Sequence, residues 1–295
     1  MSRSLSIILA LGVLALPSSA VGAPPQQQTV YASVLDAAGV PVTGLSTTDF
    51  VVREDGVDRE VMSAAPASEP LRIAVLVDTS QRMGRSINDV RRALRAFIAS
   101  THGQNEIALF EFGERPNLLV NYTRDPALLD AGVGRIFARP ATGSYLLDAV
   151  IDASKSLRGA EGVRSAIVVI TSQGPEFSNR YHETVLNELR TSHATLHSFV
   201  LEQSRRRLSL SDGAREREIT LDEGARLTGG RREYLLTSMS LSDRLQSLSR
   251  ELASQYQVAY TRPDGLIPPR TLDLTVRAPR LTVRATRVPV AGIGR

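Results

Sequence analysis

The chain has 295 residues and a formal net charge of +4, carried almost wholly by arginine, with Lys155 as the single lysine. This length suffices for one good-sized α/β domain and a smaller partner, because domains commonly contain about 100 to 200 residues. Acidic residues are scattered among the basic ones, which argues against nucleic-acid binding, where positive charge would cluster. The chain has no cysteine, which excludes disulfides, thiolate metal sites and a lipid anchor on an N-terminal cysteine.

The first residues have the pattern of a secretory signal peptide. A basic start at Arg3 precedes an apolar run from Leu5 to Leu16, and small residues follow Pro17. The apolar run is shorter than the ~20 residues that a transmembrane helix needs. We expect residues 1–23 to be a cleaved signal peptide and no later segment to span a membrane. The mature protein should then be secreted, or lie in the periplasm or cell envelope.

Residues 24–69 have β character. Short runs rich in Val and Phe, Val30 to Leu35 and Phe50 to Arg53, are bounded by turns that contain Asp and Gly, a pattern typical of strands joined by turns. Residues 64–70 are small and include proline, which predicts a linker.

Residues 70–253 alternate between apolar strands and amphipathic helices. Ile73 to Val77 is a continuous apolar run, and apolar residues then recur at helical spacing from Ile87 to Ile98. We expect a polar surface excursion from Glu202 to Glu218 and a short helix from Asp222 to Leu227. Apolar strands separated by helices predict an α/β fold with a doubly wound, mostly parallel sheet. Further strands are expected at 107–112, 166–171 and 195–201, and further helices at 126–137, 146–157, 181–191 and 240–252.

Residues 254–295 return to β character, with expected strands at 256–261, 271–277 and 281–288. Two or three strands are marginal in isolation. We therefore expect the first and last β segments to pair, so that both chain ends form one small β-sandwich.

The first strand of the α/β region ends in Val77-Asp78-Thr79-Ser80-Gln81-Arg82, and ligands of open α/β sheets bind at the carboxyl ends of strands. This Asp-x-Ser segment resembles the start of the metal-ion-dependent adhesion site of the von Willebrand factor type A family. Thr142 to Ala149 resembles that family's Gly-Gly-Thr-x-Leu-x-Asp-Ala segment, and Ile167 to Gly174 its strand that ends in Thr-Asp-Gly. The flanking segments Gly39 to Gly56 and Thr228 to Tyr260 resemble a bacterial, exported branch of the family.

The resemblance implies a site for a hard dication such as Mg²⁺, held by hydroxyl and carboxylate oxygens, with one position left for an acidic residue of a partner protein. Asp78 and Ser80 match the family pattern, whereas Arg82, Ser144 and Ser172 stand at the positions of its second serine, threonine and later aspartate. The degenerate adhesion site is therefore expected to comprise these five residues and to bind a partner protein.

The substitutions change the charge of the expected site by about two units, and a charge pair ~4 Å apart contributes ~4 kcal/mol at an effective dielectric of 20. We expect no tightly bound metal and no cofactor, with Asp78 and Ser80 as weak Mg²⁺ ligands at most. Arg82 is expected to take the place of the missing cation beside Asp78. A second interpretation stays open, in which Asp78 and Ser80 only cap the following helix.

Two other features carry less weight. His193 and His197 have a ligand-like spacing only within a helix, and they flank the start of an expected strand, which favours packing roles. No Gly-x-Ser-x-Gly nucleophile elbow and no phosphate-binding loop occurs. The sequence thus favours a non-catalytic binding or scaffold protein, with a hydrolase-like α/β enzyme or a purely structural envelope protein as the alternatives.

Overall fold

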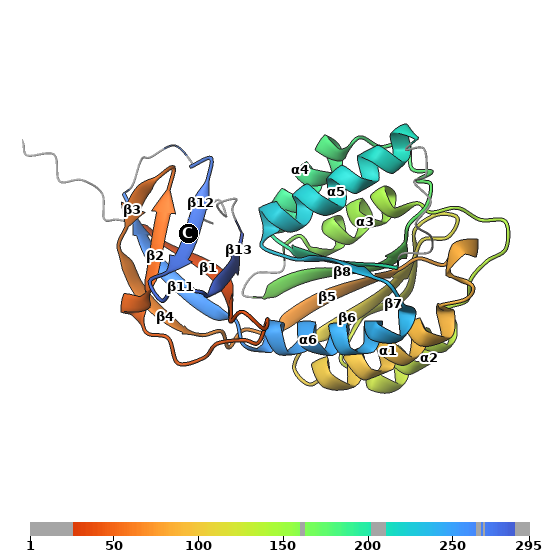
Figure 1. The fold of residues 1–295 in the computed structure, drawn as a ribbon, viewed down its shortest axis with the longest axis horizontal. Helices are drawn as coiled ribbons and strands as arrows, with labels where there is room; N and C mark the ends of the chain where they lie inside the picture. Colours follow the sequence, from red (N-terminus) through yellow and green to blue (C-terminus); the bar gives the residue numbers. More distant parts are fainter. Residues whose placement is uncertain (1–25, 160–162, 202–210, 264–266, 268, 287–295) are drawn as a thin grey trace, which may run out of the picture.

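The structure is a computed structural model that describes residues 26–159, 163–201, 211–263, 267 and 269–286. The expected signal peptide at residues 1–23 lies outside the described residues. None of the helices in the described ranges combines the length and apolar character needed to cross a bilayer. Figure 1 shows two parts side by side, a sheet covered by helices and a smaller all-β part.

The larger part is built on a six-stranded sheet with the order β10-β9-β8-β5-β6-β7. Neighbouring strands are parallel, except that β7 runs antiparallel to β6. The central strands are buried along almost their whole length, as expected where helices cover both faces. The strands are β5 (Leu71–Val77), β6 (Glu106–Glu111), β7 (Asn117–Thr123), β8 (Arg164–Ser172), β9 (Thr195–Leu201) and β10 (Arg232–Leu235).

Helices pack on both faces of this sheet (Figure 1). Because side chains alternate along a strand, Ile73 and Val75 enter one apolar core and Ala74 and Leu76 the other. The expected α/β fold is confirmed. One face carries α1 (Ile87–Thr101), α2 (Pro126–Gly134) and α6 (Leu241–Ala253), and the other carries α3 (Leu146–Leu157), α4 (His182–Ser192) and α5 (Asp212–Thr228).

The smaller part consists of two antiparallel sheets, in the orders β13-β1-β11-β4 and β12-β2-β3. Strands from both chain ends pair directly, since β1 lies between β11 and β13 and β2 pairs with β12. The two sheets share one apolar core that includes Val30, Phe50 and Tyr256. The strands are β1 (Gln26–Leu35), β2 (Phe50–Glu54), β3 (Val57–Arg59), β4 (Val61–Pro66), β11 (Tyr256–Arg262), β12 (Leu272–Val276) and β13 (Thr282–Ala285).

Two expectations for local structure were wrong. The expected linker at residues 64–70 begins inside β4, whose small side chains still pair with β11 because pairing uses the backbone. Residues 202–210 of the expected polar excursion lie outside the described residues. The rest of it is helical, because α5 begins at Asp212 after the N-cap Ser211 and ends at Thr228, before the C-cap Gly229 in the left-handed conformation.

Candidate functional site

The five residues expected to form the site come together at the carboxyl ends of β5 and β8. These strands are neighbours, while β6 lies on the other side of β5, so the chain order reverses here, where ligands of open α/β sheets bind. A cavity of about 230 Å³ opens at this point. All five residues line it: Asp78, Ser80, Arg82, Ser144 and Ser172.

Asp78 follows β5 directly and is fully buried. Its Oδ1 accepts a hydrogen bond from the Ser80 backbone N–H (2.8 Å), and its Oδ2 accepts from the Thr171 hydroxyl (2.8 Å) and the Ser172 N–H (3.3 Å). These contacts tie the loop after β5 to the end of β8. The described partners of the carboxylate are thus neutral donors, rather than the Arg82 guanidinium that the sequence suggested.

Ser80 occupies the N-cap position of a short 3-10 helix (Gln81–Met83), but its side chain makes no capping hydrogen bond. The Asp78 carboxylate bonds the Ser80 N–H, two residues ahead, and so shapes the turn that leads into this helix. The capping interpretation therefore does not account for the Ser80 hydroxyl, and Ser80 lines the cavity.

Two serine hydroxyls at the site are buried without a hydrogen-bond partner among the described residues, Ser144 Oγ and Ser172 Oγ. Ser144 precedes α3, and Ser172 ends β8. Buried polar atoms without partners are uncommon because they lose their hydration without compensation. Their presence on the cavity wall indicates that this part of the structure has hydrogen-bonding capacity for a ligand.

The Arg82 side chain is exposed and runs across Gly174. A Cβ atom at position 174 would lie 2.8 Å from Arg82 Cδ and 3.0 Å from Nε. Gly174 therefore leaves the space through which the Arg82 side chain reaches the cavity rim.

Arg217, on α5, is a further site residue, which the sequence pattern did not predict. It is only 1% exposed and lines the cavity. Its Nη2 donates to Thr171 Oγ1 (2.6 Å) and to the Ser172 carbonyl (2.5 Å), and its Nη1 donates to the Gly174 carbonyl (3.4 Å). The Thr171 hydroxyl thus links the Asp78 carboxylate to a buried guanidinium. The sequence feature that could have identified Arg217 is a helical spacing, which places it on the buried face of α5 with Ala214, Leu221 and Ala225.

Glu176 forms an isolated parallel β-bridge with Ser144 and is also buried. Its carboxylate accepts hydrogen bonds from the backbone N–H groups of Leu146 (3.2 Å) and Ser178 (3.0 Å). Burial raises the pKa of Glu176, and the hydrogen bonds from Ser178 and the charge of Arg217 oppose that rise. The Glu176 carboxylate therefore holds the loops around the cavity together and is not among the described residues that line it.

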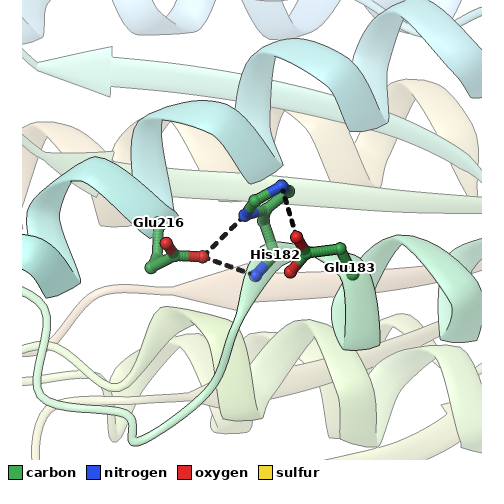
Figure 2. Close-up of side chains that lie close together, drawn as sticks. All are labelled: His182, Glu183 and Glu216. Atoms are coloured by element: carbon green, nitrogen blue, oxygen red, sulfur yellow. Dashed lines mark hydrogen bonds and ion pairs between the residues drawn. The ribbon is translucent and has the colours of Figure 1, made fainter.

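The start of α4 is joined to α5 by His182, which contacts Glu216. Figure 2 shows the His182 ring between two carboxylates: Nδ1 lies 2.7 Å from Glu216 Oε2, and Nε2 lies 3.3 Å from Glu183 Oε1. The His182 backbone N–H also donates to Glu216 Oε2 (2.7 Å). Glu216 contacts Nδ1 and Glu183 contacts Nε2. A metal ion bound to one ring nitrogen would therefore leave the carboxylate at the other nitrogen outside its coordination. This group is better explained as a clamp between α4 and α5 than as a metal site.

The donor set at the candidate site does not fit a tightly held dication. The described residues that line its cavity include one carboxylate, Asp78, whose two oxygens already accept three hydrogen bonds, and two guanidiniums, Arg82 and Arg217. Mg²⁺ prefers anionic oxygens and near-octahedral geometry, and a buried guanidinium behind Ser172 opposes a second cation.

The fold and the position of this cavity define a class of protein, the α/β domains that present a ligand site above the carboxyl ends of a doubly wound sheet. Residues 73–175 match the family model of the von Willebrand factor type A domain. The chain therefore contains a von Willebrand factor type A domain, as its sequence indicated. Proteins with this domain often act in protein binding or adhesion.

Solved structures share the fold at low sequence identity. A von Willebrand factor type A protein from Catenulispora acidiphila is 11% identical, with a TM-score of 0.51 over 94% of this chain and 75% of that one. Proximal thread matrix protein 1 from the mussel byssus, with a zinc-occupied MIDAS motif, is 10% identical, with a TM-score of 0.52 over 68% and 49%. The pilus adhesin SpaC from Lactobacillus rhamnosus GG is 11% identical, with a TM-score of 0.50 over 82% and 47%. A search of curated proteins gives no match.

Proposed function

We propose that this chain is an exported, non-catalytic protein that binds a partner protein through a metal-independent form of the adhesion site. The observation that carries the proposal is the buried Arg217 guanidinium, which lies against Ser172, where the family pattern has a carboxylate. This fixed positive charge would attract an acidic group of the partner, as a bound dication does in the family pattern. Arg82 at the rim supplies a second guanidinium, suited to bidentate contact with an acidic side chain.

The cavity rim supports a protein partner. Phe177 lines the cavity and is 53% exposed, and its ring covers Gly143, where a Cβ atom would lie 2.1 Å from Phe177 Cδ2. An exposed aromatic residue beside a guanidinium is typical of protein-binding hot spots. We propose that an acidic side chain of the partner contacts Arg82 while an apolar neighbour packs on Phe177.

The lining of the cavity favours binding over hydrolysis. A serine nucleophile needs a base within hydrogen-bond reach, and no histidine is found among the described residues that line this cavity. The export part of the proposal rests on the pattern of residues 1–23.

The test is a pull-down from secreted and envelope proteins of the source organism, performed with Mg²⁺ and with EDTA. The protein should retain its partner in EDTA, and Arg82→Glu should abolish capture. Arg85→Glu is the matched control, because Arg85 is an exposed arginine on the same loop and is expected to leave capture unchanged. Capture that requires Mg²⁺ would reject the metal-independent site, and no specific capture would favour a purely structural role.

A further inference from the structure

A second cavity, of about 440 Å³, lies at the opposite end of the sheet from the candidate adhesion site. It is lined by residues at the amino ends of β5, β8 and β9 and by residues of β1 and β11, where the two parts of the molecule meet (Figure 1). Small-molecule sites commonly have volumes of about 300 to 1,000 Å³ and occur preferentially at such junctions. The size and position of this cavity suit a small organic ligand.

The walls combine an apolar surface with a few polar groups. Leu71, Leu157 and Val163 contribute apolar side chains, and Tyr31 and Glu69 contribute a phenol and a carboxylate. Burial, the negative charge of Glu69 and a hydrogen bond to Glu69 raise the pKa of the Tyr31 hydroxyl, while a hydrogen bond with Gln257 and the charge of Arg164 oppose the rise. The phenol therefore stays protonated as a hydrogen-bonding group. An apolar surface with few polar groups favours a ligand that has an apolar body and one polar end.

The carboxylate of Glu69 is only half satisfied. Its Oε1 accepts a hydrogen bond from Gln257 Nε2 (2.7 Å), while Oε2 is buried with no hydrogen-bond partner among the described residues. A buried charged oxygen without a donor is costly because its hydration is lost. The cavity therefore has a strong acceptor that a ligand can satisfy.

Arg164 is the cationic group on the wall, and the donors of its guanidinium are bonded to neutral acceptors around the cavity. Arg164 Nε donates to the Glu69 carbonyl (3.0 Å), and its Nη1 donates to the Leu252 carbonyl (2.8 Å) and to Gln255 Oε1 (2.9 Å). The guanidinium also lies 5.9 Å from the centre of the Tyr31 ring. Burial lowers the pKa of Arg164, and the negative charge of Glu69 opposes that fall. Arg164 is thus a structural tie rather than an anion-binding group.

Two helices end at the cavity and add negative potential. Leu157 closes α3, and Ser192 and the C-cap His193 close α4; all three line the wall. Helix C-termini carry a partial negative charge and favour cations. Burial lowers the pKa of His193, which keeps its ring neutral at pH 7.

We propose that this cavity binds a small organic cation, an amine or guanidine on an apolar body, whose N–H groups donate to Glu69. The ligand lies against Leu71 and Leu157, and its charge faces the carboxylate and the two helix ends. Because the ligand contacts β1 and β11 as well as β5 and β8, it joins the all-β part to the α/β domain. This site is separate from the candidate adhesion site and does not depend on its function.

The test uses three probes of one shape, benzylamine, benzyl alcohol and benzoate, titrated into the purified protein and followed by NMR. Benzylamine should bind at least about tenfold more tightly than benzyl alcohol, the change expected for one charge-assisted hydrogen bond, and benzoate should bind most weakly. Glu69→Gln keeps the shape of the side chain. It should lower the affinity for benzylamine by about tenfold and leave the affinity for benzyl alcohol unchanged.

Glu114→Gln is the matched control, because it removes one carboxylate at the other end of the sheet, and it should not change benzylamine binding. Thr191→Trp, at the exposed rim of the cavity, should block benzylamine while the protein stays folded by circular dichroism. Absence of benzylamine binding, equal or tighter binding of benzoate, or unchanged binding in Glu69→Gln would each overturn the proposal.

Discussion

At the scale of single residues, Arg217 connects the fold to the candidate adhesion site. Its guanidinium donates three hydrogen bonds to groups at and after the end of β8, and its side chain is buried on α5. Replacing one partner of a buried charged network leaves the other groups without compensation. Arg217 should therefore contribute to stability as well as to the charge of the cavity.

Arg217→Met should lower the free energy of unfolding by about 3 kcal/mol, because hydrogen bonds to a buried charged group are lost. Arg215→Met, on the exposed face of the same helix, should change it by less than about 0.5 kcal/mol. Urea denaturation of the two variants measures both values. Equal stabilities would show that the Arg217 contacts contribute no net free energy.

His197 predicts a pH dependence of stability. The side chain is fully buried in β9, and burial, followed by the charges of Arg231 and Arg284, holds its pKa well below the ordinary 6.5. The unfolded chain binds a proton near pH 6.5 while the folded one does not, so stability falls as the pH drops below 6.5 towards the lowered folded pKa. His197→Gln should flatten this part of the profile measured by urea unfolding between pH 5 and 8. An identical slope in His197→Gln and the unchanged protein would refute the assignment.

The five expected residues were assigned to one site through the resemblance to the von Willebrand factor type A family. The apolar pattern by itself placed Asp78 and Ser172 at the ends of strands and Ser144 before a helix. Arg217 could not be placed, because the first turns of α5 were taken for a polar loop. The buried face of α5 begins with Ala214 and Arg217, a small residue and a charged one. The helical spacing of apolar residues was therefore hard to recognise in these turns. The contacts of Asp78 were also beyond sequence reasoning, since the neutral donors come from loops that only the fold brings together.

At the scale of elements, the contact between α4 and α5 fixes the helix that carries Arg217. Hydrogen bonds from the His182 backbone and ring lower the pKa of Glu216. A carboxylate with a lowered folded pKa adds stability above its unfolded pKa of about 4.5, and this contribution is lost as the pH falls through the folded value.

Glu216→Gln should accordingly destabilise the protein at pH 6 and have a smaller effect as the pH approaches 3. The difference in unfolding free energy between the variant and the unchanged protein, followed across this range, tests the clamp. Glu183→Gln is the control, since Glu183 is 73% exposed and its contact with His182 is longer, 3.3 Å. A Glu216→Gln effect that does not change with pH would mean that the charge of this carboxylate is unimportant.

Two strands of the large sheet were also missed, β7 and β10, and both lie at its edges. Edge strands are covered less completely, so their sequences are less apolar: β7 has no fully buried residue, and β10 has one, Leu235. The buried central strands β5, β8 and β9 were predictable because they have almost continuous apolar runs.

At the scale of the whole molecule, we propose that residues 24–69 and 254–295 fold as one unit around the α/β domain at residues 70–253. The pairing of β1 with β11 and β13, and of β2 with β12, supports this division. Removal of residues 269–295 deletes β12 and β13 and should expose the core face of β2. Limited proteolysis should then cleave residues 29–61 faster by about tenfold for each 1.4 kcal/mol of stability lost. Unchanged resistance of this segment would contradict the proposed unit.

The pattern of the two β segments allowed the pairing of the chain ends to be anticipated, because neither segment has enough strands to bury a face alone. The split of the seven strands into a four-stranded and a three-stranded sheet was not predictable. It depends on β4, whose small residues gave no strand signal.

We propose that the candidate adhesion site binds its partner without a metal, and isothermal titration of the purified protein with Mg²⁺ and Mn²⁺ measures this. We expect no affinity tighter than about millimolar, because a dication meets the Asp78 carboxylate and the guanidiniums of Arg82 and Arg217. The combined Arg82→Ser and Ser172→Asp variant, which restores oxygen ligands and removes one of these charges, should show measurable binding in the same experiment. Uptake of Mg²⁺ by the unchanged protein at micromolar concentration would contradict the claim and assign a conventional metal-dependent adhesion site.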